Sequence, residues 1–450
     1  MSGVGGVDGV GGVDGAGGVG HVPASSANPS VWDARIRASL DRVVDEGRWR
    51  APREFDALGP AGVLEHGSPV VSFASNDYLG LSAHPTVVAA AQSALTRWGA
   101  GSGASRLVTG TRPIHSELEE ALADWKGTEA AVCFPTGFAA NLGVLCVLGG
   151  PGVRILSDEL NHASIIDGCR LSRSALAVYR HRDMGHLAEL LAADPSTPGG
   201  TPMPTIVVTD SVFSMDGDVA PLDHLVRLCE RHNALLILDE AHAVLGPDLP
   251  GAPRGGGGME GRDRDGVQGG TVVRVGTLSK TLGSLGGFVA ASCDIVDLIV
   301  NRARSYIFST APTPADTGAA LAALQIVRSA DGAALVRRLA ALIDLVAEAG
   351  FAPPGHPSPI IPVVLGSEQA ALNASAALLQ EGLWVPAIRP PTVPVGTSRL
   401  RVTLSAAHTD DNVTRLLQAL ARLPRPAQPT PTATATARPA TTPATTPATL

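Results

Sequence analysis

The sequence predicts an α/β protein with a large, doubly wound and mostly parallel sheet, followed by a smaller α+β domain. Short apolar runs alternate with helical patterns between residues 115 and 280, which is typical of βαβ units. Polar clusters directly follow these runs, as expected where ligands bind outside the carboxyl ends of parallel strands. The composition agrees, because 44% of the 450 residues are hydrophobic and only 4% are aromatic.

Charge and hydropathy exclude several classes of partner. The formal net charge is −8, so no basic surface is expected that could neutralise the phosphates of a nucleic acid. No apolar run approaches the length of a membrane span, and no membrane partner is expected. The five cysteines are scattered, with neither zinc-ligand spacing nor a disulfide framework. We therefore expect a cytoplasmic protein.

Composition divides the chain into five segments. Residues 1–30 are a Gly/Val-rich tail and residues 424–450 a Pro/Thr/Ala-rich tail, and both are predicted to be disordered because neither can bury a core. Residues 31–75 are expected to form an N-terminal helix and strand segment. Residues 76–313 are expected to form the large domain, and residues 314–423 the small C-terminal domain.

The first predicted elements lead into the large domain. An amphipathic pattern over 32–50 predicts a helix, and the apolar run 70–74 predicts a short strand. A helix is predicted over 115–125 and a buried strand over 130–134. The Thr-Gly pair at 136–137 then opens an apolar helix. Free N–H groups at such a helix start can bind an anion, although an ordinary helix cap has the same sequence pattern.

Four further apolar runs complete the predicted sheet. They lie at 155–157, 205–209, 234–238 and 272–276, with a helix predicted over 222–232. Because parallel strands present their carboxyl ends at one edge of a sheet, the residues after these runs should lie close together.

The remaining residues predict the smaller domain. Helices are predicted over 315–328 and 332–349, and strands near 360–365 and 399–404. Residues 250–270, rich in Gly, Arg and Asp, are predicted to be a surface loop before the strand at 272–276.

Lys280 is singled out by the near absence of lysine. The chain has 34 Lys and Arg residues, but only Lys126 and Lys280 are lysines. Arginine replaces lysine where charge is needed, but a guanidinium cannot act as an amine nucleophile. Lys280 is therefore a candidate for imine formation, although by itself it is equally consistent with a surface lysine.

Several polar residues join Lys280 at the ends of the predicted strands. Taken singly, the carboxylate could also cap a turn, and either histidine could also be a hydrogen-bonded core residue. Together they indicate pyridoxal 5'-phosphate chemistry, with an amine for the imine, a carboxylate for the pyridine nitrogen, an imidazole against the ring and small donors for a phosphate. These residues are Asp239, His162, His242, Ser214, Thr277 and Lys280.

Four motifs resemble those of the α-oxoamine synthases, a family of fold-type-I pyridoxal-phosphate enzymes. They read SNDYLGL at 75–81, GSGASRLVTG at 101–110, FSMDGD at 213–218 and DEAH at 239–242. The resemblance extends from residue 32 to residue 423. The family joins an amino acid to an acyl thioester with loss of CO2, which implies a pyridoxal-phosphate-dependent acyltransferase with the fold-type-I architecture.

The resemblance also implies residue roles. Lys280 carries the cofactor and moves the α-proton, Asp239 holds the proton of the pyridine nitrogen, and His162 stacks on the ring, so these three are the expected catalytic residues. The expected cofactor contacts are Gly137, Phe138, His162, Ser214, Asp239, His242, Thr277, Lys280 and Thr310, the last reaching the phosphate in a partner subunit. The expected substrate contacts are Arg50, Asn76, His162, Arg389 and Thr392, with Arg389 on the amino-acid carboxylate. No metal is expected.

The segment WVPAIRPPTVP at 384–394 resembles family members that condense L-alanine with a pimeloyl thioester in biotin biosynthesis. Coenzyme A and an acyl carrier protein both remain open as the acyl carrier, and a homodimer with shared active sites is expected. One alternative is a sister synthase using glycine with a short acyl-CoA or serine with a long one. A different class is a catalytically silent, cofactor-binding dimer.

Overall fold

The computed structural model describes residues 30–65, 67–193, 203–245 and 272–424. The chain forms two units, Met1–Glu54 and Phe55–Leu450. In the first unit, α1 (Val31–Asp45) begins at Ser30, whose side chain accepts a hydrogen bond from the backbone of Asp33. The helix predicted over 32–50 therefore ends earlier than expected. Gly47 has a φ of 64°, which stops the helix because this left-handed conformation suits glycine.

The second unit contains a seven-stranded sheet in the order β4-β10-β9-β8-β7-β5-β6. Six strands run parallel and only β10 is antiparallel to its neighbours, which confirms the doubly wound, mostly parallel sheet. The strands are β4 (Ala130–Phe134), β5 (Arg154–Asp158), β6 (Ala175–Tyr179), β7 (Thr205–Asp210), β8 (Leu235–Asp239), β9 (Val272–Thr277) and β10 (Gly287–Ala291).

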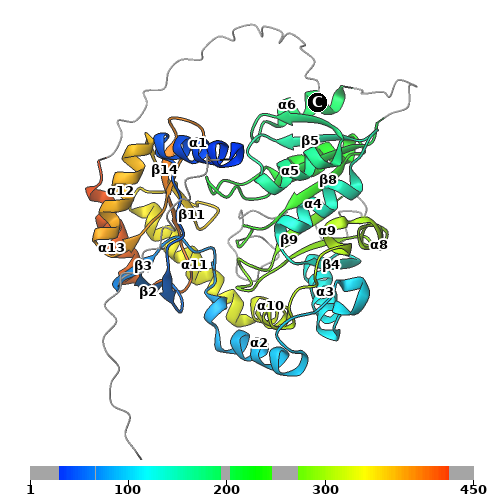
Figure 1. Cartoon of the computed structure of the whole chain (residues 1–450), viewed down its shortest axis with the longest axis horizontal. Helices are drawn as coiled ribbons and strands as arrows, with labels where there is room; N and C mark the ends of the chain where they lie inside the picture. The colour runs from blue at the N-terminus through cyan, green and yellow to red at the C-terminus, as the bar shows by residue number, and fades with distance from the viewer. Residues whose placement is uncertain (1–29, 66, 194–202, 246–271, 425–450) are drawn as a thin grey trace, which may run out of the picture. The chain divides into compact units, whose positions relative to one another are not determined.

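The central strands are buried on both faces, as expected when helices cover both sides of a parallel sheet. Within β7, Ile206 and Val208 belong to one apolar cluster and Val207 to another, because successive side chains of a strand point to opposite faces. Figure 1 shows α4 and α5 beside β5 and β8. The helices of this region are α3 (Pro113–Lys126), α4 (Gly137–Leu148), α5 (Ala163–Ser172), α6 (Met184–Ala192), α7 (Leu222–Arg231), α8 (Cys293–Arg302) and α9 (Arg304–Ile307), with the π-helical turn η2 (Arg106–Gly110).

Two smaller sheets lie in the same unit. One has the order β1-β2-β3-β12 and the other β11-β14-β13. Their strands are β1 (Phe55–Ala57), β2 (Ala61–Leu64), β3 (Ser68–Ser72), β11 (Ile360–Gly366), β12 (Leu383–Trp384), β13 (Ala387–Ile388) and β14 (Ser398–Thr403). The accompanying helices are η1 (Leu81–Ala83), α2 (Pro85–Trp98), α10 (Pro314–Val327), α11 (Ala330–Glu348), α12 (Glu368–Gln380) and α13 (Asp410–Arg422).

The small-domain elements predicted from the sequence are present, and β3 adds a connection that the sequence did not predict. β3 pairs in parallel with β12, so a strand near the start of the unit joins a strand more than 300 residues later. The domain boundaries predicted at 75/76 and 313/314 fall inside this unit and stay a prediction. The two predicted disordered tails and the loop predicted over 250–270 lie outside the described residues, apart from residues 30 and 424 at the tail boundaries.

No single described helix has the length and apolar composition to cross a membrane. Only α10 and α11 taken together pass that test, and the break between them bends the pair by 79°.

Candidate active site

A cavity of about 230 Å³ lies at the carboxyl ends of the parallel strands. Its walls come from the loops that follow β4, β5, β7, β8 and β9, so the fold brings together residues up to 149 positions apart. The lining residues are Thr136, Gly137, Phe138, Asn141, His162, Ser164, Asp210, Ser214, Asp239, Ala241, His242, Gly276, Thr277, Ser279, Lys280 and Leu285.

Lys280 lies in the turn between β9 and β10, and its amine reaches into this cavity. Its Nζ is 2.8 Å from Nε2 of His242. Burial lowers the pKa of Lys280, the charges of Asp239 and Asp210 oppose this, and the charge of Arg401 adds to the lowering. The net effect favours the neutral amine, which is the form that can act as a nucleophile or a base.

A row of hydrogen bonds behind Lys280 orients His242. The hydroxyl of Tyr78 lies 2.5 Å from Nδ1 of His242 and 3.3 Å from Oδ1 of Asn76. Because Oδ1 can only accept, Tyr78 donates to Asn76 and accepts from Nδ1–H of His242. Nε2 of His242 is then the acceptor for Lys280. Burial, with the positive charges of Lys280 and Arg401, lowers the pKa of His242 well below its usual value, so the ring stays neutral.

Asp239 ends β8 inside the cavity, and it is only 6% exposed. Its Oδ1 accepts from the backbone of Ala241 at 2.9 Å, and its Oδ2 accepts from Nδ2 of Asn141 at 2.7 Å. Asp210 lies opposite Asp239 in the register of β7 and β8. Burial, together with the charge of Asp239, raises the pKa of Asp210 well above its usual value.

His162 caps α5 on another wall of the cavity. Its Nδ1 lies 2.7 Å from the hydroxyl of Ser164, and its backbone N–H donates to Asp210 at 2.8 Å. The ring contacts Phe138 edge-on, with centroids 6.5 Å apart. Burial lowers the pKa of His162, the charge of Asp239 opposes this, and the charge of Lys280 adds to the lowering. His162 therefore offers a neutral aromatic face.

Small hydrogen-bond donors also line the cavity. Thr277 Oγ1 lies 2.8 Å from the hydroxyl of Ser279. Nearby, α4 begins at Gly137, and its first N–H groups cannot bond within the helix. A Cβ on Gly287 would lie 2.5 Å from Gly137 Cα, so glycine at position 287 lets the start of α4 approach β10. Hydroxyls and a helix N-terminus are a favourable setting for a phosphate.

These residues fit the pyridoxal 5'-phosphate that the family resemblance implies. One cavity holds a buried amine, a buried carboxylate, an imidazole with a free face, and hydroxyls beside a helix N-terminus. Each group of the cofactor would thus meet a residue of matching chemistry. Among the described residues, no group of His, Cys, Asp and Glu side chains could hold a metal ion.

The structure brings most of the predicted cofactor residues together. Thr310 is the exception, because it lies at the exposed bridge between residues 105 and 310 and does not line the cavity. The cavity lining contains Gly137, Phe138, His162, Ser214, Asp239, His242, Thr277 and Lys280.

The predicted substrate residues are more dispersed. Asn76 joins the Tyr78 network through its side chain. Nη1 of Arg389 lies 3.9 Å from Oε2 of Glu368. Thr392 is exposed in the loop after β13. Arg50 belongs to the first unit, and its role stays a prediction.

Arg401 was missed by the sequence reasoning. It comes from β14, is only 5% exposed, and donates to Oδ1 of Asn76 at 3.1 Å and to the carbonyl of Ser214 at 2.5 Å. Burial lowers its pKa. An arginine within the strand predicted near 399–404 was the signal that could have found it, because a charge is rarely buried without a function or a partner.

Four more residues of the site were also missed. In the sequence, each could be explained as an aromatic residue of a motif, a residue of a helix or the last residue of a strand. Only their hydrogen bonds in the structure connect them to the site. They are Tyr78, Asn141, Ser164 and Asp210.

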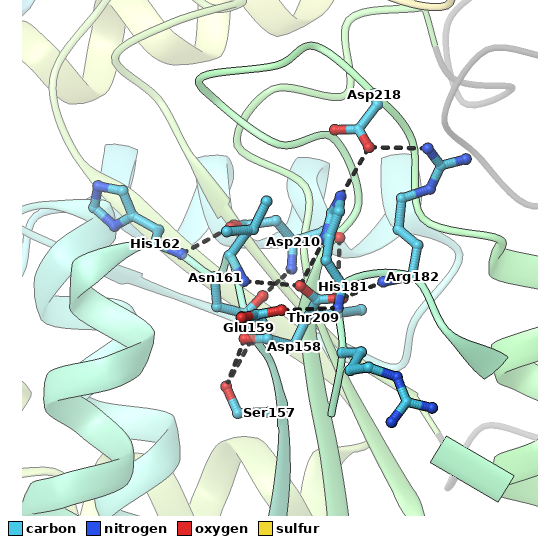
Figure 2. A network of polar contacts seen from close by, with 12 residues as sticks. Ser157, Asp158, Glu159, Asn161, His162, His181, Arg182, Thr209, Asp210 and Asp218 are labelled. Carbon is cyan, nitrogen blue, oxygen red and sulfur yellow. Dashed lines mark hydrogen bonds and ion pairs between the residues drawn. The ribbon is translucent and has the colours of Figure 1, made fainter. Parts of the chain in front are cut away.

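A second polar network supports the cavity loops from behind, and Figure 2 shows it. His181 lies between two carboxylates, with Nδ1 2.8 Å from Asp158 and Nε2 2.9 Å from Asp218. Burial lowers the pKa of His181, but the bonds to the two aspartates outweigh this and raise it to about 9. Asp158 ends β5 just before His162, and Asp218 follows the loop of Ser214. His181 therefore connects two loops of the site.

We predict that this connection weakens in alkali. A pKa raised above the unfolded value means that the stability contribution is complete below about pH 6.5 and is lost as pH rises through about 9. The His181→Gln variant should melt at a lower temperature than the wild type at pH 7. Its free energy of unfolding should be lower by at most about 3 kcal/mol, and this difference should shrink by pH 10. Thermal unfolding across this pH range measures it. His224→Gln, on α7, is the control, and a deficit independent of pH would contradict the assignment.

Comparisons with known proteins give a consistent result. The family model for aminotransferase class I and II matches residues 68–420. The chain is 45% identical over 394 residues to an 8-amino-7-oxononanoate synthase of Geobacter sulfurreducens, covering 86% of this chain and 97% of that protein. It is 49% identical over 379 residues to the protein of the same name from Anaeromyxobacter dehalogenans, covering 82% and 91%.

Solved structures agree with the sequence matches. A serine palmitoyltransferase with bound PLP-myriocin aldimine from S. paucimobilis has a TM-score of 0.74 at 30% identity, covering 86% of this chain and 95% of that chain. An 8-amino-7-oxononanoate synthase of Francisella tularensis has a TM-score of 0.62 at 25% identity, covering 78% and 97%.

Proposed function

The chain belongs to the 8-amino-7-oxononanoate synthases, within the class I and II aminotransferase family, and from this premise we infer how its residues carry out the reaction. It is a pyridoxal-phosphate-dependent acyltransferase of biotin biosynthesis. It joins L-alanine to a pimeloyl thioester to give 8-amino-7-oxononanoate, CO2 and the free thiol carrier. The observation that supports the residue roles best is the cavity in which the Lys280 amine, the Asp239 carboxylate and the His162 ring meet.

Pyridoxal 5'-phosphate, when bound, supplies an aldehyde for imine formation and a ring that withdraws electrons from the substrate's α-carbon. Asp239 would hold a proton on the pyridine nitrogen, because its carboxylate is buried and already fixed by Asn141 and Ala241. His162 would cover the ring face. The phosphate would lie against Thr277, Ser214 and the first N–H groups of α4.

Lys280 is the residue that we assign to proton transfer. Its Nζ would take the proton from the α-carbon of alanine and later return one to the product. The lowered pKa favours the neutral amine required for the first step. His242 accepts from Lys280 through Nε2, which holds the amine in place, and it would hydrogen-bond the phenolic oxygen of the cofactor.

The substrate carboxylate has two candidate arginines. Arg389 was assigned to it from the sequence, in a proline-rich segment that also contains Thr392. Arg401 is the second candidate, because it is buried beside Asn76 and its positive charge lowers the pKa of both Lys280 and His242. A guanidinium suits a carboxylate at either position. We propose that Arg401 and Asn76 face the carboxylate together, with Arg389 as the outer contact.

We also propose a homodimer. Leu107, Val108 and Phe308 are 54%, 73% and 70% exposed, and their segments lie side by side because Ser105 bridges Thr310. A second copy covering this apolar patch would bring Thr310 toward its partner. Sedimentation should show a dimer for the wild type and for Leu58→Glu, and dissociation for Phe308→Glu. A monomeric wild type would contradict the proposal.

A cytoplasmic location is proposed as well. All five cysteines lie in the described residues and none is in a disulfide, which agrees with a reducing compartment. The carrier of the pimeloyl group is coenzyme A or an acyl carrier protein.

Substrate selection tests the function directly. A methyl group in an apolar pocket contributes about 1–3 kcal/mol, so alanine should be preferred over glycine by roughly 10- to 200-fold in kcat/KM. The measurement compares alanine, glycine and serine, each with pimeloyl-, acetyl-, succinyl- and palmitoyl-CoA, and adds pimeloyl-acyl carrier protein. Higher kcat/KM for glycine with acetyl- or succinyl-CoA, or for serine with palmitoyl-CoA, would contradict the assignment, and complete inactivity would favour a silent cofactor-binding protein.

A further inference from the structure

A continuous row of buried hydrogen bonds connects Asp239 to His162 through Asn141 and Ser164. Nδ2 of Asn141 lies 2.7 Å from Oδ2 of Asp239 and 3.0 Å from Oγ of Ser164. Oγ of Ser164 lies 2.7 Å from Nδ1 of His162. Asn141 is 2% exposed and Ser164 is 1% exposed, so water does not compete for these bonds.

The direction of every bond in this row is fixed by chemistry. An amide nitrogen has two hydrogens and no lone pair to accept with, so Asn141 donates to both Asp239 and Ser164. The opposite amide orientation would place Oδ1 of Asn141 against the Asp239 carboxylate, oxygen to oxygen. Oδ1 instead lies on the other side, where no described residue bonds it.

The bond that Ser164 accepts from Asn141 also decides what Ser164 donates to His162. Its oxygen accepts from Asn141, so its O–H remains to donate to Nδ1 of His162. The backbone N–H of Ser164 donates to the same Nδ1 at 3.3 Å. A ring nitrogen that receives two donors carries no proton of its own, and the proton of the neutral ring must then lie on Nε2.

We propose that Asn141 and Ser164 are positioning residues, which lock the Asp239 carboxylate and hold His162 as a neutral imidazole protonated on Nε2. This rests on the proposed roles of Asp239 and His162 toward the cofactor. The row joins Asp239, which would hold the pyridine proton, to His162, which would cover the ring, so Asn141 and Ser164 orient both side chains. A neutral His162 also keeps a second positive charge away from Lys280, which needs its neutral form for proton transfer.

The tautomer can be observed without measuring activity. The full-length holoenzyme is labelled with 15N-histidine, and the signal of His162 is identified by its loss in His162→Gln. We expect an unprotonated Nδ1 and a protonated Nε2 between pH 6 and pH 8. A protonated Nδ1 in the wild type would overturn the proposal.

Variants test the two positioning residues separately. Ser164→Ala should shift the Nδ1 signal toward the protonated position and raise the Kd for pyridoxal 5'-phosphate about tenfold, since one hydrogen bond to each neighbour is lost. Asn141→Ala should raise the Kd by a similar factor through Asp239, while Nε2 keeps its proton because the Ser164 donors remain.

The matched control is Ser172→Ala on the same helix. Its hydroxyl donates to the carbonyl of Cys169 at 2.7 Å, and its oxygen lies 3.0 Å from the hydroxyl of Ser174. It should leave the His162 signal and the Kd unchanged. Wild-type values in Ser164→Ala would overturn the proposal. If the wild type binds the cofactor but does not turn over alanine, the proposed function fails, while the histidine signals still decide the tautomer.

Discussion

Replacing Lys280 with alanine should reduce kcat by more than about 10⁴-fold, the upper end of what one general acid or base contributes. The loss should be this large because Lys280 is assigned two tasks, the attachment of the cofactor and the transfer of the α-proton. Lys280→Arg should be equally inactive, since a guanidinium stays charged and cannot form the imine. Steady-state turnover with alanine and pimeloyl-CoA measures both variants.

The second lysine provides the control. Lys126 is buried in an ion pair with Glu240 at 2.9 Å, with its Nζ 3.9 Å from the ring centroid of Trp125, so it is engaged away from the cavity. Lys126→Arg should keep its activity. Borohydride should fix the cofactor to the peptide that contains Lys280, because only an imine is reducible in this way, and label on the Lys126 peptide would contradict the assignment.

Replacing Asp239 with asparagine should slow kcat by about 10²- to 10³-fold, the range measured when one preorganised electrostatic contact is removed. A neutral amide cannot stabilise a protonated pyridine nitrogen. Both carboxylate oxygens accept from donors, so the change also sets an amide N–H against either Nδ2 of Asn141 or the backbone N–H of Ala241. One of the two hydrogen bonds that now fix the carboxylate is therefore lost. Single-turnover kinetics with saturating cofactor separates the slow step from weaker cofactor binding.

A surface carboxylate is the matched control for this change. Asp124 pairs with Arg328 at 2.5 Å, and its side chain is 64% exposed, so Asp124→Asn should keep the wild-type rate. Circular dichroism should show that Asp239→Asn is folded. A folded Asp239→Asn variant with near-normal turnover would mean that Asp239 has a structural role only.

The sequence by itself determined the class of the fold, and it predicted most of the residues that line the candidate cofactor cavity. Apolar runs bounded by polar residues predicted β4, β5, β7, β8 and β9, because a strand buried on both faces must be apolar throughout. The same runs located Lys280, Asp239 and His162, since residues that follow parallel strands meet at one sheet edge. The two lysines were told apart by composition and loop chemistry, and the structure agrees with this separation.

Only the tertiary structure decided which polar residues touch one another. β10 was not predicted, because its antiparallel pairing with β4 and β9 is set by long-range register. Tyr78 reaches His242 across 164 residues, and Arg401 reaches Asn76 across 325. Such contacts leave no local pattern. A hydrogen bond depends on distance and direction, and both are fixed by packing between distant segments, so the row from Asp239 through Asn141 and Ser164 to His162 becomes visible only in the folded chain.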